Sequence, residues 1–508
     1  MAFWWYGAVL YHVYLRSFRD SNGDGYGDLG GLLAGLDHIA ALGADAIWLS
    51  PVNPSPDTDW GYDVSDYCAV HPELGTLAQL DEVIAEAAAR GMRVLLDLVP
   101  NHTSDQHAWF LDARTARDAV HRDYYVWADP KNGGPPNNWL DDTGEPAWDW
   151  DGATGQYYLH NFLPTQPDLN WRNPQVGREF DAIMDFWCDR GVAGFRIDVA
   201  NGLFKDAALR DNPSNAELLP GHLPVPGSHG QQHIYNYNQP EVHGVYRHWR
   251  ARAAERTPQT LLLGETWVLH PSQLAEYYGD GDELQLAFNF PLIFACFSAR
   301  EFARVIAETF AALPPGACPI WAGSNHDLPR LGTRWAGGDQ AKMRLAHTVL
   351  ALLPGVYGLY YGDELGMADS DIPAELQRDP LTLGGKNGQW PRDNARSPMR
   401  WTPDGGFTTG EPWLPLGPDP SLNVASQDAD PDSMLSFTRD LLALRRAIHG
   451  GQLNGYEQLH VDDAVFAFAT GPAVVVANFS GEEVSWAGVG ETGTKPVAPW
   501  SALVYLVD

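Results

Sequence analysis

The sequence predicts an α/β protein: a (β/α)8 TIM barrel with an inserted subdomain after the third strand and a C-terminal antiparallel β domain. Short apolar runs rich in β-branched and aromatic residues recur eight times, and Ala-rich segments of helical length lie between them. This alternation is typical of parallel strands joined by helices. The eight runs lie near residues 8, 45, 93, 194, 260, 284, 318 and 355.

Two segments interrupt the alternation. Residues 102–167, between the third and fourth runs, are rich in Asn, Gly, Pro, Asp and Trp and too long for an ordinary loop, so they predict a small inserted subdomain. Residues 1–101 and 168–448 then form the catalytic barrel, which ends with a helix at 433–448. The short alternating strands that follow predict a β-sandwich domain over residues 449–508.

The composition excludes several classes of partner. The 508-residue chain has 65 acidic and 33 basic residues and a net charge of -32, which disfavours nucleic acids and anionic membranes. A small neutral molecule is the substrate class that fits this charge. The apolar N-terminus lacks a basic region and a cleavage site, and no stretch is long enough to span a bilayer, so we expect a cytoplasmic protein.

Three carboxylates lie at the ends of predicted strands: Asp198 in GFRIDVA, Glu265 in LLLGETW and Asp327 in WAGSNHD. Parallel strands of a barrel end at the same edge, so these acids should converge. Burying like charges together is costly unless the chemistry needs one ionised carboxylate and one neutral carboxylic acid. Retaining cleavage of a glycosidic bond has this need, with a nucleophile and an acid/base roughly 5 Å apart.

Strand geometry and burial predict the protonation states of two of these acids. Arg196 precedes Asp198 by two residues and projects to the same face of the strand, so it can keep Asp198 ionised. The flanking Trp267 and a dehydrated pocket would instead raise the pKa of Glu265 until it is protonated at working pH.

Six sequence blocks carry a family resemblance. DLVPNH, GFRIDV, GET and SNHD occur in this order at the predicted strand ends, and QPDLNW and RDNARSPMRW accompany them. Together they resemble glycoside hydrolase family 13, the α-amylase family, over the whole chain, and the last two resemble its oligo-1,6-glucosidase and α-glucosidase group. The blocks lie at residues 97–102, 194–199, 264–266, 324–327, 166–171 and 392–401.

The resemblance implies roles for the residues in these blocks. Asp198 looks like the nucleophile that forms a β-glucosyl ester, and Glu265 looks like the general acid that protonates the leaving oxygen. Asp327 looks like the third acid, which holds ring hydroxyls in the transition state. His102 and His326 resemble the histidines that donate hydrogen bonds to substrate hydroxyls.

Further residues are implied at the closed end of the pocket. DTDWGYDVSDY, residues 57–67, resembles the segment in which an acid and an aromatic close the pocket, here Asp59 and Tyr62. By the same analogy Arg396 pairs with Asp59 and grips the terminal glucose, although Arg392 and Arg400 are close alternatives. A closed end implies action at the non-reducing end. Phe162 is an equal candidate for an apolar wall of the pocket or for a core position.

The motif DSNGDGYGD, residues 20–28, predicts a structural Ca²⁺ site. It presents oxygen atoms at alternate positions, as the start of an EF-hand loop does. A simple turn rich in Asp, Asn and Gly is the alternative. A matching loop in the α-glucosidase group favours the metal. The expected ligands are Asp20, Asn22, Asp24, the carbonyl of Tyr26 and Asp28.

The resemblance predicts a retaining exo-α-glucosidase acting on maltose- or isomaltose-type sugars and leaves the linkage open. A Val next to the nucleophile, here Val199, tends to accompany α-1,6 action in this group. However, three segments look different from typical oligo-1,6-glucosidases: ANGLFKD at 200–206, the stretch 228–243 and the Thr266-Trp267 pair. A transglucosylase, or a sucrose or maltose isomerase, would use the same covalent intermediate. An inactive binding homologue is disfavoured by the complete set of acids and the lack of a membrane span.

Overall fold

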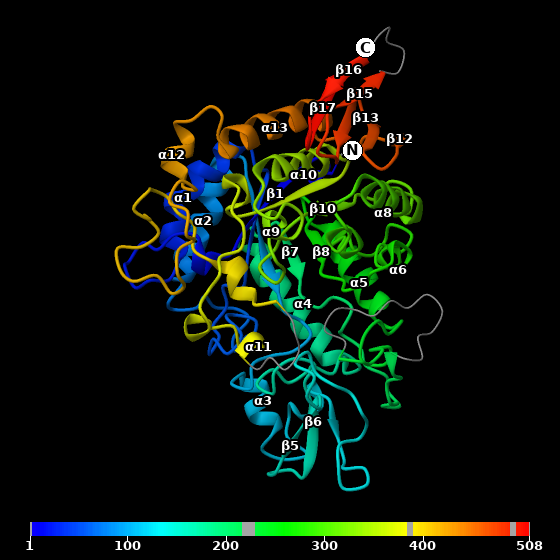
Figure 1. The fold of residues 1–508 in the computed structure, drawn as a ribbon. Helices are drawn as coiled ribbons and strands as arrows, with labels where there is room; N and C mark the ends of the chain where they lie inside the picture. Colours follow the sequence, from blue (N-terminus) through cyan, green and yellow to red (C-terminus); the bar gives the residue numbers. More distant parts are fainter. Residues whose placement is uncertain (1–2, 216–228, 384–389, 488–493, 507–508) are drawn as a thin grey trace.

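The computed structural model of the chain describes residues 3–215, 229–383, 390–487 and 494–506. Its parallel strands form a barrel at the centre of the molecule (Figure 1). They pair in the order β10-β11-β1-β2-β3-β7-β8-β9, and a parallel bridge between Phe288 and Ile320 joins the two ends of this row. All eight predicted strands are confirmed. They are β1 (Val9–Val13), β2 (Ala46–Leu49), β3 (Arg93–Leu98), β7 (Gly194–Ile197), β8 (Leu261–Gly264), β9 (Leu286–Ala287), β10 (Ile320–Ala322) and β11 (Val356–Tyr360).

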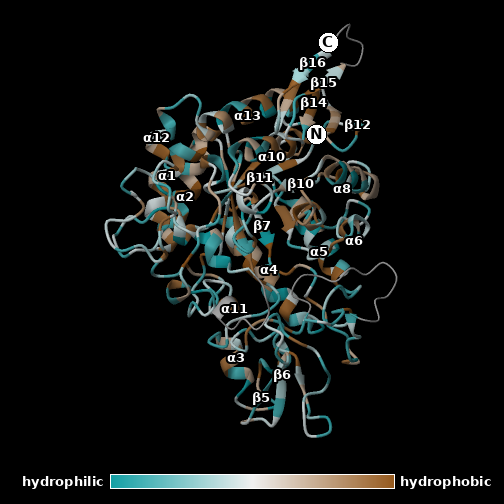
Figure 2. Cartoon of the chain, in the orientation of Figure 1, coloured by the Kyte–Doolittle hydropathy of each residue, from teal (hydrophilic) through white to brown (hydrophobic). Residues whose placement is uncertain are grey.

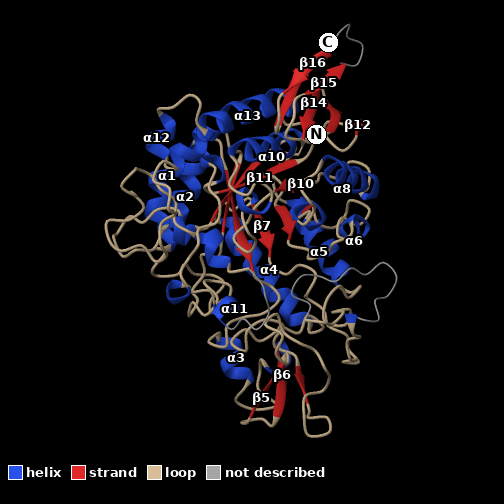
Figure 3. Ribbon diagram, viewed as in Figure 1, coloured by secondary structure: helices blue, strands red, loops and turns tan. Residues whose placement is uncertain are grey.

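Helices surround the barrel (Figure 3). Their ends follow local sequence signals, since Thr76 and Gln79 exchange side-chain and backbone hydrogen bonds at the start of α2. Gly43, at a φ of 84°, ends α1 in the left-handed conformation that glycine tolerates. The larger outer helices are α1 (Leu29–Leu42), α2 (Leu77–Ala89), α4 (Pro174–Asp189), α5 (Val242–Glu255), α8 (Ala299–Ala312), α10 (Gln340–Leu352) and α13 (Met434–His449). Shorter ones are α3 (Ala108–Ala113), α6 (Pro271–Glu276), α7 (Phe290–Ile293), α9 (Leu331–Arg334), α11 (Pro380–Leu383) and α12 (Val424–Asp428).

Two apolar layers hold the barrel together. Inside it, residues such as Trp48, Leu263 and Ile320 pack against one another, and Trp5 joins them at the amino ends of the strands. Strand residues of the opposite parity, such as Ile47, pack outward against the helices. Figure 2 shows both hydrophobic and hydrophilic stretches on helices such as α10 and α13, as expected for helices with one buried face. The carboxyl ends of the strands remain available for polar side chains.

The segment between β3 and α4 carries a small antiparallel sheet that projects from the barrel, away from the C-terminal strands (Figure 1). Its strand order is β4-β6-β5, and Trp139, Trp148 and Leu159 form a core of its own. This sheet lies inside residues 102–167, where the sequence predicts an insertion. The strands are β4 (Trp127–Ala128), β5 (Trp148–Asp151) and β6 (Gln156–Leu159).

The C-terminal region forms two antiparallel sheets, and the larger one lies against α8 and α10. Helix α13 extends to His449, so the first strand of this region begins at Tyr456. The larger sheet contains β12 (Tyr456–Val461), β13 (Val465–Thr470), β14 (Ala473–Asn478) and β17 (Ser501–Leu506), and the smaller one contains β15 (Val484–Ala487) and β16 (Thr494–Val497). None of the helices in the described part of the chain has the length and apolar character needed to cross a membrane.

Candidate active site

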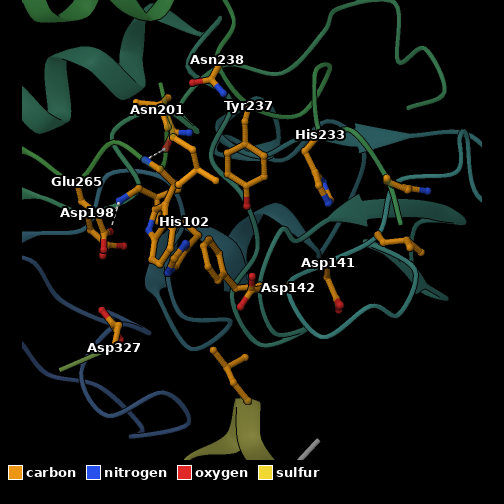
Figure 4. A pocket seen from close by; sticks show the side chains of 18 of the residues that line it. His102, Asp141, Asp142, Asp198, Asn201, His233, Tyr237, Asn238, Glu265 and Asp327 are labelled. Carbon is orange, nitrogen blue, oxygen red and sulfur yellow. Dashed lines mark hydrogen bonds between the residues drawn. The ribbon is translucent and has the colours of Figure 1, made fainter. Parts of the chain in front are cut away.

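A pocket of about 280 Å³ lies at the carboxyl ends of the barrel strands (Figure 4). Asp198 and Glu265 directly follow β7 and β8, and Asp327 lies in the loop after β10. All three line the pocket. The side chains of Asp198 and Glu265 are only 7% and 4% exposed. The structure thus brings together the three carboxylates that the sequence placed at strand ends.

The Arg196 guanidinium contacts two of these acids, Asp198 and Glu265, and a further carboxylate, Asp97. Arg196 Nη1 lies 2.8 Å from Asp97 Oδ1 and 2.6 Å from Asp198 Oδ1, and its Nη2 lies 2.6 Å from Glu265 Oε1. The Arg196 side chain is completely buried, so its charge depends on these partners. Asp97, which opens the DLVPNH block, received no role from the sequence. Burial raises the pKa of Asp97 to about 6, and Arg196 opposes that rise.

Burial raises the pKa of Asp198 well above its usual range and also raises the pKa of Glu265. Arg196 opposes the rise at both groups, while the charges of the other carboxylates add to it at Asp198 and the charge of Asp327 adds to it at Glu265. The single charge of Arg196 cannot balance Asp97, Asp198 and Glu265 if all three are ionised. These three carboxylates therefore tend to keep one proton among them. An acid cluster with one proton can supply both an ionised nucleophile and a protonated acid.

The backbone after Asp198 orients Glu265. Val199 has a φ of 44°, in the left-handed region that β-branched residues rarely adopt. In this conformation its N–H donates a hydrogen bond to Glu265 Oε2 at 3.1 Å. Both carboxylate oxygens of Glu265 are therefore held, one by Val199 and one by Arg196.

A chain of contacts connects Asp97 with Asp327. The Tyr62 hydroxyl lies 3.0 Å from Asp97 Oδ2 and 2.6 Å from His326 Nε2, which lies 3.1 Å from Asp327 Oδ2. The Tyr62 and His326 rings are stacked, with centroids 5.3 Å apart. Burial, with the charges of nearby arginines, lowers the pKa of His326 well below its usual value. Neutral His326 can donate to Asp327 while Tyr62 donates to Asp97.

Asp59 and Arg392 both line the pocket and contact each other, with Arg392 Nη2 2.8 Å from Asp59 Oδ1. Arg392 Nη1 lies 3.1 Å from Asp327 Oδ1, and Asp379 holds the same guanidinium at 2.5 Å. Arg392 thus connects Asp59 with Asp327, one of the three acids that follow barrel strands. It also leaves Asp59 with a charged partner in a buried position.

The predicted pairing of Arg396 with Asp59 is wrong. Arg396 Nη2 lies 3.1 Å from Asp327 Oδ1, and its Nε donates to the carbonyl of His326 at 2.8 Å. Both arginines belong to a 3₁₀ turn, Arg392–Arg396, in which residues four apart point in different directions. The sequence alone could not decide which of them faces Asp59.

His102 lines the pocket beside Phe162, whose ring centroid is 5.2 Å from that of His102. His102 Nε2 donates to the carbonyl of Tyr62 at 3.0 Å, and Nδ1 accepts from Asn101 Nδ2 at 3.1 Å. Burial lowers the pKa of His102, which keeps the ring neutral. Phe162 is therefore a pocket wall, as one of the two sequence interpretations holds.

A buried lysine lies behind this wall. Lys205 Nζ lies 2.8 Å from Asn101 Oδ1 and 2.7 Å from Asp168 Oδ2, and Asn161 Nδ2 donates to the same carboxylate oxygen at 2.6 Å. These contacts join the loops after β3 and β7 to the inserted segment. Asn101 and Asp168 lie in the DLVPNH and QPDLNW blocks, but no local feature of the sequence connects either of them with Lys205.

The acidic loop after β1 forms a series of turns. Asp20 accepts hydrogen bonds from N–H groups of residues 22, 23 and 25, at 2.8–2.9 Å. Asn22 and Asp24 each accept from the residue two positions on, and Asp28 caps α1. Burial alone would raise the pKa of Asp20, but the Thr408 hydroxyl and these N–H groups lower it, so the carboxylate stays ionised.

The chain matches the family model described as "Alpha amylase, catalytic domain" over residues 12–450. It is 42% identical over 496 residues to a probable α-glucosidase of Rhizobium meliloti, covering 91% of this chain and 88% of that protein. It is 35% identical to an oligo-1,6-glucosidase of Parageobacillus thermoglucosidasius, covering 94% and 90%.

Two solved structures are similar over almost their full length. An α-glucosyl transfer enzyme has a TM-score of 0.93 and 37% identity, with 99% of each chain covered. The trehalulose synthase of Pseudomonas mesoacidophila has a TM-score of 0.90 and 32% identity, with 100% of each chain covered.

A double-mutant cycle tests the pairing of Asp59 with Arg392. Because removing either partner strands a buried charge, Asp59→Ala and Arg392→Ala should show a coupling free energy of at least about 1.5 kcal/mol. Asp59→Ala with Arg396→Ala should show less than about 0.5 kcal/mol. The measurement is kcat/KM for an aryl α-glucoside at each corner. If the coupling free energy of Asp59 with Arg396 were larger than that with Arg392, Arg396 would be the partner of Asp59, as the sequence predicted.

Proposed function

The chain is a glycoside hydrolase of the α-amylase family, family 13, and we propose that it is a retaining, exo-acting α-glucosidase. It would release α-glucose from the non-reducing end of short maltose- or isomaltose-type α-glucosides. The observation that carries this proposal is that Asp198 and Glu265 contact two nitrogens of the same guanidinium, each at 2.6 Å. Such closeness suits retaining enzymes, whose carboxyl groups lie about 5–5.5 Å apart, better than inverting ones.

In the first step of this mechanism the Asp198 carboxylate attacks the anomeric carbon of the terminal glucose. Protonated Glu265 transfers its proton to the glycosidic oxygen as the bond from that oxygen to the anomeric carbon breaks. The aglycone leaves with that proton, and glucose remains bound to Asp198 as a β-glucosyl ester. Glu265, now ionised, removes a proton from water, which attacks the anomeric carbon and releases α-glucose.

Exo action follows from the closed end of the pocket. The contact of Asp59 with Arg392 supports this, because an ion pair across the pocket would block a chain that extends beyond the terminal glucose. Asp327 lines the pocket and could bind ring hydroxyls, and the buried His326 would hold its carboxylate in position. Contacts that strengthen in the distorted transition state accelerate the reaction.

Transfer to a sugar is the second candidate function. The names of two close structural relatives, an α-glucosyl transfer enzyme and a trehalulose synthase, favour it. An acceptor hydroxyl in place of water would give a new glucoside through the same ester. Asn201, Asn238 and Trp267 line the pocket and could hold such an acceptor.

A product profile distinguishes the two candidates. The protein is incubated with maltose, isomaltose, sucrose and trehalose, each at low and high concentration. The sugars that it cleaves should release glucose stoichiometrically, because water is the expected attacking group. Chromatography of the products checks this, with the Asp198→Ala variant as the blank. Rearranged or longer sugars as the main products would establish transfer instead, and no turnover of any α-glucoside would reject both candidates.

The pH dependence tests the roles of the two acids. Activity should fall at low pH as Asp198 is protonated, and at high pH as Glu265 loses its proton through its raised pKa. Glu265→Gln should abolish the high-pH fall and lower kcat/KM for a disaccharide about 100-fold or more, because Gln cannot protonate the leaving oxygen. The check is kcat/KM against pH, with an aryl α-glucoside of low leaving-group pKa for the variant. A high-pH fall that persists in the variant would assign it to another group.

The loop at residues 20–28 is also proposed to hold a structural Ca²⁺. Its oxygen donors, Asp20, Asn22, Asp24, the carbonyl of Tyr26 and Asp28, are the types that a hard cation prefers. Among the described residues its carboxylates do not form a group within 4.8 Å of one another, so binding would require side chains to rotate inward.

Removal of calcium tests this site. A chelator should lower the melting temperature of the protein, because an ion that binds the folded state but not the unfolded chain stabilises the fold by an amount that grows with its free concentration. Asp24→Ala should remove that sensitivity, whereas Asp118→Ala, at an exposed position outside the loop, should keep it. Differential scanning calorimetry with and without added Ca²⁺ measures both effects. If the untreated and chelated proteins melted at the same temperature, the loop would hold no stabilising Ca²⁺ and would be a hydrogen-bonded turn only.

A further inference from the structure

The pocket contains a carboxylate that the proposed mechanism does not use. Asp142, from the inserted segment, lines the same pocket as Asp198 and Glu265 (Figure 4). We propose that Asp142 and the Tyr237 hydroxyl bind vicinal hydroxyl groups of the leaving or accepting sugar, and so select the aglycone. This inference rests on the proposed function and adds specificity-determining residues to it.

Backbone contacts on both sides hold Asp142 in place. Its N–H donates to the carbonyl of Asn161 at 2.9 Å, and its carbonyl accepts from His229 Nε2 at 2.8 Å. Because both backbone groups are occupied by neighbours, the side chain is the part of Asp142 that remains for the pocket.

The neighbouring Asp141 shows the contrast. Its Oδ1 accepts from the N–H and hydroxyl of Thr143 at 2.9 and 2.7 Å and from the N–H of Glu145 at 3.1 Å. Asp141 therefore stabilises the turn. Within the described ranges of the chain, the Asp142 carboxylate makes no hydrogen bond or ion pair. It is a half-buried acceptor that lacks donors.

Tyr237 lies on the facing wall of the pocket. Its ring lies close to the loop after β7, where a Cβ added at Gly202 would come within 3.2 Å of Cε1. Figure 4 shows its hydroxyl directed to the side on which Asp142 lies. Burial raises the pKa of Tyr237 well above its usual value, and the charge of Asp142 adds to the rise, so the hydroxyl remains a donor.

The charge state of Asp142 fits the same role. Burial raises its pKa to about 6, and Arg392 and His229 oppose the rise, so the group is mostly ionised at neutral pH. A carboxylate with two free oxygens accepts from two hydroxyl groups on adjacent carbons, and a phenol both donates and accepts. Neighbouring hydroxyls of a sugar ring present this pattern, whereas an aryl leaving group lacks it.

Substrates with and without these hydroxyls test the proposal. The assay compares kcat/KM for the disaccharide that the enzyme cleaves fastest with kcat/KM for 4-nitrophenyl α-glucoside, in Asp142→Asn and in Tyr237→Phe. Asp142→Asn should lower the disaccharide-to-aryl ratio about 10- to 100-fold, the range expected for losing hydrogen bonds to a charged group. Tyr237→Phe should lower it less, because a neutral hydrogen bond is weaker.

Asp118→Asn, an equal change of charge at an exposed site outside the pocket, is the matched control and should leave the ratio unchanged. An unchanged ratio in Asp142→Asn would overturn the proposal. So would an equal loss with both substrates, which would place Asp142 at the glucose-binding part of the pocket. The melting temperatures of the variants show whether a substitution disturbs folding. A mild loss of folded protein lowers kcat/KM equally for both substrates and therefore cancels in the disaccharide-to-aryl ratio. If the wild-type protein cleaved neither substrate, the proposed function itself would fail.

Discussion

The buried guanidinium of Arg196 is the charge on which the pocket depends. It contacts Asp97, Asp198 and Glu265, each within 2.8 Å. Without a cation these carboxylates would repel one another in a site that excludes water, and all of them would be driven to their neutral forms. With a single cation the group can keep both charge and a proton, which is the state that a two-carboxylate mechanism starts from.

The barrel and its loops make different contributions to this pocket. Parallel strands fix the ends from which Asp198 and Glu265 project, and packing on both faces of the strands leaves these ends little freedom. The opposite walls come from Arg392 after the eighth strand and from Asp142 in the insertion. An α-glucosyl transfer enzyme and a trehalulose synthase have the same fold as this chain, and the loops around the pocket are where specificity usually varies on a shared barrel.

Much of the fold and of the catalytic centre was predictable because it depends on local rules. Strand composition located the barrel strands, parity along a strand placed Arg196 on the face of Asp198, and strand ends placed the acids together. The choice between Arg392 and Arg396 was not predictable, because it depends on how a short 3₁₀ turn is oriented by its surroundings. Asp97 received no role although it opens the DLVPNH block, because its contact with Arg196 depends on the pairing of two strands. Lys205 was missed because a lone Lys carries no local signal.

The sequence by itself determined the element order, the strand-end acids and the family, because each follows from residue type and spacing along one segment. Only the tertiary structure decided which distant side chains meet. Arg392 reaches Asp59 across more than three hundred positions of the chain, and Lys205 reaches Asp168 and Asn101 from another loop. The physical reason is that burial and pairing energies depend on distances in space, which several independently oriented loops set together.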